Sequence, residues 1–347
     1  MNILSGGQTD FFGLDIGSTA LRAVQLHGAG PVKALGRYAQ EPLSGNVALS
    51  DSKADQAALA QVIKEFLNKS GISSKNVAAS LPSSRVFTTV VDLDKMSPDE
   101  LNKAIYYQAD SYIPTPPDKS KIDWAVIGDS PKDPNKVEVL LSSVPNEFIE
   151  ARLDLLEGIG LNVVAFEPVS MALTRSILAA DATLPQMILN IGSKATDIVV
   201  AMNGAPHLTR AIPIGSEAII RAASQSLGVD TNQAQQFVFK FGVSKDKLEG
   251  KVYTAILGTV DSLMAEIEKS IKFFQDRYLS AQLERIIVTG GASIIPELPL
   301  YIANKFNINV EIGNAWRNVS FPSSQQNELL SVSNHFAVAV GLAERSS

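Results

Sequence analysis

The stretch Leu14-Asp15-Ile16-Gly17-Ser18 recurs, with a single substitution, as Leu189-Asn190-Ile191-Gly192-Ser193. The two copies lie 175 residues apart (190 − 15), which is about half of the 347-residue chain. Each copy ends an apolar run and is followed by further strand-forming residues, a pattern that predicts a strand, a glycine turn and a second strand. A repeat at half the chain length predicts two similar lobes with a ligand-binding cleft between them.

The residue types in these turns are suited to binding phosphate. Glycine lets backbone N–H groups approach an anion closely, and Ser18 and Ser193 add hydroxyl donors. Asp15, at the end of its strand, can hold Mg²⁺ directly or through water. A third stretch, Gly290-Gly291-Ala292, has little side-chain bulk and would let a flat nucleoside lie against the backbone. A single copy of the turn could equally be an ordinary strand-to-turn junction, and it is the repetition that favours a polyphosphate site.

Composition excludes several other classes of protein. The 36 acidic and 30 basic residues give a net charge of −6, which argues against a broad nucleic-acid surface. The chain has no cysteine, so disulfides, thiolate metal sites, iron–sulfur clusters and a cysteine nucleophile are excluded, and its three histidines disfavour a histidine-rich metal site. No apolar run reaches the roughly 18 residues of a membrane span, and the start Met1–Gly7 lacks the features of a signal peptide. We therefore expect a cytoplasmic location.

Residues 85–160 have a character of their own. A strand is predicted over 85–93 from its two-residue alternation, and Ser97-Pro98-Asp99-Glu100 is typical of a helix start with a capping box. That helix is expected to end before Pro114, followed by strands at 122–128 and 136–144 and a helix at 146–157. This order predicts a small inserted subdomain.

The remaining chain alternates strands and helices, as expected for an α/β protein. The predicted strands are 11–16, 20–27, 32–39, 76–80, 162–166, 187–191, 196–202, 207–213 and 286–289. The predicted helices are 52–69, 168–180, a helical block over about 216–280, and a final helix at 335–344.

The two turns together with Val288-Thr289-Gly290-Gly291-Ala292 resemble the actin-like ATPase superfamily, which includes actin, the heat-shock chaperone ATPases and sugar kinases. The resemblance implies a two-lobed fold of duplicated ribonuclease-H-like domains and a bound ATP with Mg²⁺. It gives Glu167, in Phe166-Glu167-Pro168, a candidate catalytic role beside Asn190. The implied nucleotide-binding residues are Asp15, Gly17, Ser18, Thr19, Arg22, Gly192, Ser193, Lys194, Gln235, Gly290, Gly291 and Ala292, with Asp15 also the metal partner.

Within the superfamily the chain resembles the PilM family of type IV pilus assembly. The residues that carry this resemblance are Phe12–Ser18 with Leu21–Val24, Ser80-Leu81-Pro82, Glu266–Ile271 with Phe274, and Phe336–Ala343. The insertion falls where PilM and the division protein FtsA carry subdomain 1C. The implied division is lobe 1 (1A) at 9–84, 161–185 and 331–347, 1C at 85–160, lobe 2 (2A) at 186–215 and 284–330, and subdomain 2B at 216–283.

The PilM resemblance also implies a partner. It predicts an adaptor that captures the N-terminal cytoplasmic tail of the inner-membrane protein PilN in a groove beside the inserted subdomain, among other pilus assembly proteins at the inner membrane. It implies no nucleic acid and no direct membrane insertion, and it leaves a homo-oligomer open. Tyr106, Tyr107 and Tyr112 are the residues we expect in the wall of that groove, although a helix that only packs on the inserted sheet would explain them as well.

Three departures from the superfamily pattern bear on catalysis. Asn190 stands where an aspartate is usual, Gln235 and Val238 replace a glutamate and a lysine, and Pro296-Glu297-Leu298 replaces a Pro-Gly-Leu. Phosphoryl transfer depends on positioned charge, so these changes predict ATP binding with slow or absent hydrolysis. A small-molecule kinase of the sugar-kinase type and an FtsA-like filament-forming protein remain the alternatives.

Overall fold

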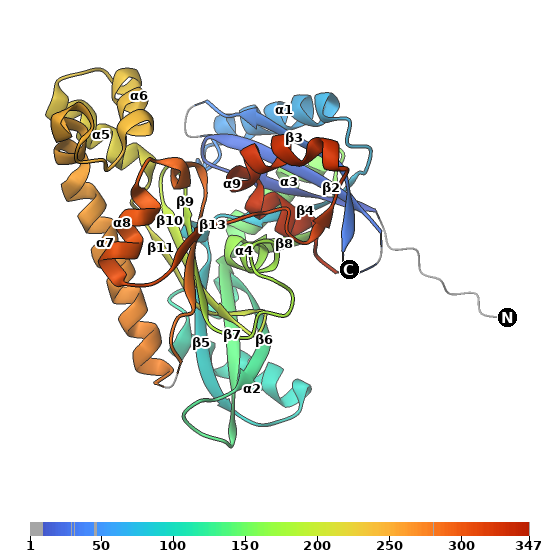
Figure 1. The fold of residues 1–347 in the computed structure, drawn as a ribbon. Coiled ribbons are helices and arrows are strands. Elements are labelled where there is room, and N and C mark those ends of the chain that lie inside the picture. Colours follow the sequence, from blue (N-terminus) through green and yellow to red (C-terminus); the bar gives the residue numbers. More distant parts are fainter. Residues whose placement is uncertain (1–9, 29, 31, 45–46, 280, 347) are drawn as a thin grey trace. The chain divides into compact units, whose positions relative to one another are not determined.

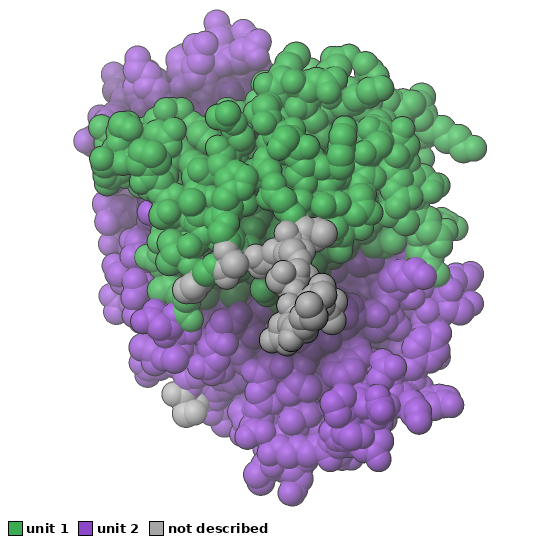
Figure 2. Space-filling view, turned by 90° about the vertical axis from the view of Figure 1, so that its right-hand side faces the viewer, with its two compact units in different colours: residues 1–85, 146–180, 315–347 green, residues 86–145, 181–314 purple. Residues whose placement is uncertain are grey.

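The structure, a computed structural model, describes residues 10–28, 30, 32–44, 47–279 and 281–346. Its contacts divide the chain into two compact units, which are coloured separately in Figure 2. Unit 1 contains residues 1–85, 146–180 and 315–347, and unit 2 contains residues 86–145 and 181–314. Below, residues 86–145 are called the inserted module and residues 181–314 the second half. The prediction that the start of the chain is not a signal peptide concerns Met1–Gly7, which lie outside the described residues.

Unit 1 is built on a six-stranded sheet in the order β14-β3-β2-β1-β4-β8 (Figure 1). Its strands are β1 (Phe11–Ile16), β2 (Ala20–His27), β3 (Lys33–Pro42), β4 (Asn76–Leu81), β8 (Asn162–Pro168) and β14 (Val319–Ser320). β1 runs antiparallel to β2 and parallel to β4. The helices are α1 (Lys53–Ser70), α3 (Asn146–Gly158), α4 (Val169–Ile177) and α9 (Gln326–Ala343). Phe12 and Leu14 of β1 share one apolar cluster with Leu59 of α1 and Leu156 of α3.

The second half repeats the same strand order. Its sheet runs β11-β10-β9-β12-β13, which matches β3-β2-β1-β4-β8 of unit 1 position by position. These strands are β9 (Gln186–Ile191), β10 (Thr196–Met202), β11 (Ala205–Ile212), β12 (Arg285–Thr289) and β13 (Val310–Ile312). As in unit 1, the first strand is antiparallel to the second and parallel to the fourth. The duplication predicted from the sequence repeat is therefore present in the fold.

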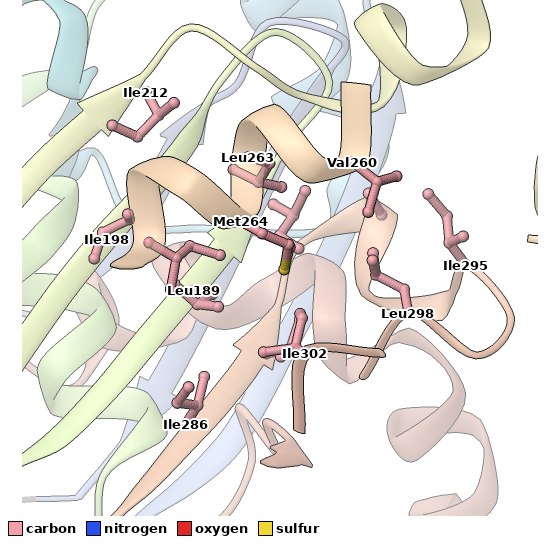
Figure 3. Packing of buried hydrophobic residues seen from close by; sticks show 14 of the residues in the cluster. Leu189, Ile198, Ile212, Val260, Leu263, Met264, Ile286, Ile295, Leu298 and Ile302 are labelled. Carbon is pink, nitrogen blue, oxygen red and sulfur yellow. The ribbon is translucent and has the colours of Figure 1, made fainter. Parts of the chain in front are cut away.

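Four helices accompany this second sheet, namely α5 (Ser216–Leu227), α6 (Thr231–Phe241), α7 (Lys251–Arg277) and α8 (Leu298–Phe306). Figure 3 shows how Met264 of α7, Leu189 of β9 and Ile302 of α8 meet in the buried core. The apolar positions of α7 recur every three or four residues, so one face of the helix enters the core along its length.

The inserted module consists of a three-stranded sheet and one helix. The sheet runs β5-β7-β6, with β5 (Phe87–Asp94), β6 (Ser120–Asp129) and β7 (Lys136–Pro145) all antiparallel. Helix α2 (Pro98–Tyr112) begins as its sequence predicts, because Ser97 N–H donates to the Glu100 carboxylate at 2.9 Å and Pro98 occupies the first turn. Leu101, Ile105 and Ala109 of α2 pack on the sheet.

The structure also differs from the expected element boundaries. The final helix begins at Gln326 rather than at 335, and the helical block at 216–280 is three helices separated by turns. Residues 315–330, expected with lobe 2, group with unit 1, where Val319 of β14 pairs with Lys33 of β3. Among the described residues, no helix is both long and apolar enough to cross a lipid bilayer.

Two glycines allow α9 to pack closely within unit 1. A Cβ atom on Gly341 would lie 1.9 Å from the Ala172 carbonyl oxygen of α4, and one on Gly13 would lie 2.3 Å from the Ala339 carbonyl oxygen. Both neighbours are backbone atoms, which cannot move aside as a side-chain end could. The glycines in two of the stretches that suggested the family therefore both allow the close packing of α9, Gly341 against α4 and Gly13 against α9 itself.

We expect Gly341→Ala to lower the free energy of unfolding by at least about 2 kcal/mol, because the added methyl group overpacks the α4–α9 contact. The matched control is Gly258→Ala in α7, where a Cβ would meet no atom within 4 Å. That change should instead raise stability by up to about 1 kcal/mol through helix propensity. Urea unfolding of both variants tests this, and equal effects of the two changes would contradict it.

Candidate functional site

The first repeated stretch forms the hairpin between β1 and β2. Gly17 N–H donates to the Ala20 carbonyl at 3.1 Å, which places Ser18 and Thr19 in the turn. In this register Asp15 lies directly opposite Arg22, with Asp15 Oδ2 and Arg22 Nη1 separated by 3.8 Å. Directly opposed residues share one face of a sheet, so the carboxylate and the guanidinium lie side by side.

Ser80 fixes the orientation of Asp15. Its hydroxyl, on the neighbouring strand β4, accepts the Ile16 N–H at 3.1 Å and donates to Asp15 Oδ1 at 3.0 Å. Ser80 was part of the stretch that suggested the family, but no role was predicted for it. The structure identifies it as the buried group that positions the proposed metal partner.

The charges of this hairpin are incompletely compensated. Burial raises the pKa of the Asp15 carboxyl above its ordinary value, against the opposing effects of Arg22 and of the Ser80 hydroxyl. Burial likewise lowers the pKa of Arg22, and Arg22 Nε is a buried donor with no acceptor among the described residues. A bound Mg²⁺ would stabilise the Asp15 carboxylate, and an anion would supply Arg22 with an acceptor. The residues present therefore fit a magnesium–phosphate group.

The second hairpin, between β9 and β10, has the same geometry with different chemistry. Gly192 N–H donates to the Ala195 carbonyl at 2.9 Å, and Asn190 lies opposite Asp197. Asn190 Nδ2 donates to Asp197 Oδ2 at 2.9 Å. The carboxylate that is missing at position 190 is thus present on the opposing strand, a feature that the sequence reasoning missed.

This second turn is held by the start of α5. Ser216 N–H donates to the Gly192 carbonyl at 3.0 Å, and a Cβ on Gly215 would lie 2.4 Å from the Ser193 carbonyl oxygen. The Ser193 hydroxyl donates to Glu217 Oε1 at 2.8 Å. The hydroxyl proton expected to face a phosphate is therefore already donated, so the Ser193 hydroxyl could contact a ligand only through its oxygen lone pairs.

The segment expected at the nucleoside lies against the same turn. Gly290 has a φ of +84°, and a Cβ there would lie 2.6 Å from Asn190 Oδ1, so this position requires glycine. Gly291 and Ala292 follow in the short 3₁₀ helix Gly291–Ile294. The structure thus brings Asn190, Gly192 and Gly290 together within the second half.

Helix α6 is tied to this segment at its end. Gly242, with a φ of +53°, leaves room for the Pro296 carbonyl, which accepts the Val243 N–H at 3.1 Å. Gln235 is exposed on α6, whereas Val238 is fully buried in the apolar core. A lysine could not occupy position 238 without burying its charge, which accounts for that departure from the superfamily pattern.

Comparison with known proteins identifies the family. Residues 13–347 match the family model described as type IV pilus assembly protein PilM. The chain belongs to the PilM family. The PilM–PilN type IV pilus biogenesis complex contains a chain that matches with a TM-score of 0.82 at 26% identity, over 96% of this chain and 97% of that one.

More remote matches agree on the fold. MreB5 of Spiroplasma citri, solved bound to AMPPNP, matches with a TM-score of 0.56 at 12% identity over 96% of this chain and 95% of its own. Cell division protein FtsA of Neisseria meningitidis serogroup B is 26% identical over 151 residues, which cover 36% of this chain and 35% of FtsA. The prediction of an actin-like α/β fold in the PilM family is confirmed.

Glu167, the candidate catalytic residue, lies on β8, which β4 separates from the first hairpin, and is paired in register with Ser80 of β4. Its carboxylate is already engaged, because Arg175 forms a two-point ion pair with it and Arg345 Nε lies 3.9 Å away. Arg175 also donates to the Gly341 carbonyl. In unit 1, Glu167 thus links β8 to α4 and to the end of α9, and a role with water or metal would compete with Arg175.

The tyrosines expected at the partner groove divide into two kinds. Tyr106 and Tyr107 are 62% and 86% exposed on the outer side of α2. Tyr112 instead packs partly against the module core, and its hydroxyl donates to Gln108 at 2.9 Å. Only Tyr106 and Tyr107 present a largely free aromatic surface within the module.

Glu344, next to this Arg175 group, gives unit 1 a pH dependence. Burial raises the pKa of its carboxyl to about 8, although Arg175 and Lys33 oppose the shift, and neither oxygen has a hydrogen-bond partner among the described residues. The folded protein therefore holds a proton at neutral pH that the unfolded chain, with a pKa near 4.5, releases.

We expect this proton to stabilise the fold fully below pH 4.5, with the contribution lost as pH rises to about 8. Glu344→Gln should remove that part of the pH dependence, so the difference in unfolding free energy between wild type and variant should change steadily across this range. Glu65→Gln, at an exposed residue of α1, is the control. Parallel stability curves for wild type and Glu344→Gln would contradict the expectation.

Proposed function

We propose that this chain is an ATP-binding adaptor of type IV pilus assembly that captures the N-terminal cytoplasmic tail of PilN. The observation that carries the proposal is the match over 96% of the chain to the PilM–PilN complex, together with the PilM family match over residues 13–347. On this proposal the protein is cytoplasmic and is recruited to the inner membrane by its partner.

The nucleotide part of the proposal rests on the two hairpins. Mg²⁺·ATP would be the bound ligand, with Asp15 as the protein's metal partner. Ser80 holds the Asp15 carboxylate in place, and Arg22 supplies a positive charge with an unused donor. In the second half, the Gly290 segment lies against the Gly192 turn and would offer a flat surface for the nucleoside.

Slow hydrolysis agrees with the way the polar groups near the two hairpins are paired. Asn190 carries no charge and its amide is bound to Asp197, while the Glu167 carboxylate is paired with Arg175. Neither group is therefore a free base for an attacking water, and a site of this kind binds nucleotide better than it turns it over.

We expect Asp15→Asn to weaken Mg²⁺·ATP binding at least about tenfold, because the change removes the negative charge that meets the metal and keeps the side-chain shape. Calorimetry with and without Mg²⁺ tests this, and the variant should also lose most of the magnesium dependence. Glu65→Gln should bind as wild type does. Unchanged affinity in Asp15→Asn would rule out this site.

For the partner, we expect the double change Tyr106→Ser/Tyr107→Ser to weaken binding of a synthetic PilN tail peptide about tenfold or more. Exposed aromatic side chains commonly carry much of an interface's binding energy, and here their removal should leave thermal stability unchanged. Phe273→Ser is the matched control, since Phe273 is also 62% exposed but lies on α7. Equal losses in both variants, or none in either, would contradict the assignment. Fluorescence anisotropy measures the affinities.

A further inference from the structure

A buried ion cluster joins the inserted module to the second half. Glu138 of β7 is 1% exposed, and its Oε1 accepts from Arg277 Nη2 at 2.7 Å and from the Tyr278 hydroxyl at 2.7 Å. Its Oε2 lies 3.3 Å from Nδ1 of His207 on β11. With Asp92 of β5, these residues are called the Glu138 cluster. Burial opposes ionisation, but the surrounding donors hold the pKa of Glu138 below its ordinary value.

The module needs a cation at this place. Asp92 and Glu138 are directly opposite each other in the β5–β7 register, where like charges repel. Arg277 Nη2 compensates both, since it also lies 2.9 Å from Asp92 Oδ1. The guanidinium comes from the end of α7, so the second half supplies the charge that the module's own sheet lacks.

The contact at the Glu138 cluster matters because of where the module lies in the sequence. The module is inserted in the unit 1 sequence, with its chain connections at residues 85–86 and 145–146. At the Glu138 cluster, Asp92 and Glu138 of the module accept hydrogen bonds from Arg277, and Glu138 also accepts one from Tyr278. The apolar cores of the module and of the second half are separate clusters, so the Glu138 cluster adds a buried polar connection to the contacts between β5 and β11. The module is thus covalently continuous with one unit and bonded to the other.

Helix α7 extends this connection toward the nucleoside segment. Its 27 residues span about 40 Å at 1.5 Å per residue, from contacts with α5 and α6 to Arg277. Val252, Leu263 and Phe274 hold it in the core along that length. Since α6 carries Gln235 and is tied to Pro296, the nucleoside segment, α7 and the Glu138 cluster form one continuous packed body.

We propose that the Glu138 cluster makes the inserted module follow the second half, so that nucleotide binding changes the affinity of the module for its peptide partner. The inference rests on the proposed function. A nucleotide that alters how the two units are related then moves the module against the unit to which its chain is connected. Without the cluster, the module keeps its two chain connections and the contacts between β5 and β11 but loses its buried ionic attachment, so its response to nucleotide is reduced.

The test measures linkage between two ligands. The affinity of a synthetic PilN tail peptide is determined with and without saturating AMPPNP·Mg²⁺, for wild type and Arg277→Gln. We expect a difference of about fivefold or more in wild type and less than twofold in Arg277→Gln, with each ligand still bound. Asp94→Asn is the matched control, because Asp94 lies two residues from Asp92 on β5 in an exposed ion pair with Lys136 and should keep the wild-type ratio.

The outcomes separate the two proposals. Failure of wild type to bind AMPPNP or the peptide would overturn the proposed function. Binding of both with no effect of one on the other, or an effect that survives in Arg277→Gln, would overturn this inference alone. If Arg277→Gln does not fold, the neutral combination Asp92→Asn/Glu138→Gln/Arg277→Gln removes the cluster without leaving a buried charge, and the same criteria apply.

A second measurement, the distance between two spin labels, tests directly whether the module is attached to the second half. The chain has no cysteine, so Lys103→Cys on α2 and Ser262→Cys on α7 give two unique spin-label sites at exposed positions. We expect one narrow distance distribution, with or without nucleotide, and a broad one when Arg277→Gln is added. A broad distribution in the unmodified background would show that the module does not follow the second half, and would overturn the inference.

Discussion

A tight hairpin closed by one backbone hydrogen bond sets the position of the candidate phosphate-binding groups in each half of the chain. The bond runs from Gly17 to Ala20 in unit 1 and from Gly192 to Ala195 in unit 2, again 175 residues apart. It fixes the register that places Asp15 opposite Arg22 and Asn190 opposite Asp197. Because side chains alternate between faces, a shift of one residue would turn all four away from their partners. The geometry of the site is therefore set by the turns before any ligand is considered.

The two hairpins have the same backbone geometry, but the charges of their paired side chains differ. Unit 1 pairs a carboxylate with a guanidinium and holds the carboxylate through the Ser80 hydroxyl. Unit 2 pairs an amide with a carboxylate and connects its turn to α5 through Glu217. The duplication thus preserved strand order and turn, which depend on backbone hydrogen bonds, while the side chains diverged. On the proposed function, Mg²⁺ would bind at the first hairpin, where Asp15 is incompletely compensated, and the second hairpin would contribute the shape of its turn.

Much of the fold could be predicted from local signals, and the errors have local causes. The repeated stretches, the alternation of β5 and the capping box at Ser97 are patterns within a few residues. The first turns of α9 (Gln326-Asn327-Glu328) are polar, so the apolar pattern that predicted the helix begins too late. Strand β14 has two residues and exists through its pairing with β3, which lies far away in the sequence. The roles of Ser80 and Asp197 also depend on partners on other strands, which a single sequence does not reveal.

The Glu138 cluster shows most clearly why such contacts escape sequence analysis. Arg277 and Glu138 are 139 residues apart, and each alone looks like an ordinary surface charge in the sequence. In the fold, two opposed carboxylates make the face of the module unsuitable for an apolar partner or for a negative one, and Arg277 satisfies both. A buried ion pair adds little net stability over an apolar contact, because desolvation offsets the attraction. The ion cluster is better explained by specificity. A misplaced module would leave Asp92 and Glu138 buried without a cation, and this energetic cost favours a single position of the module on the second half.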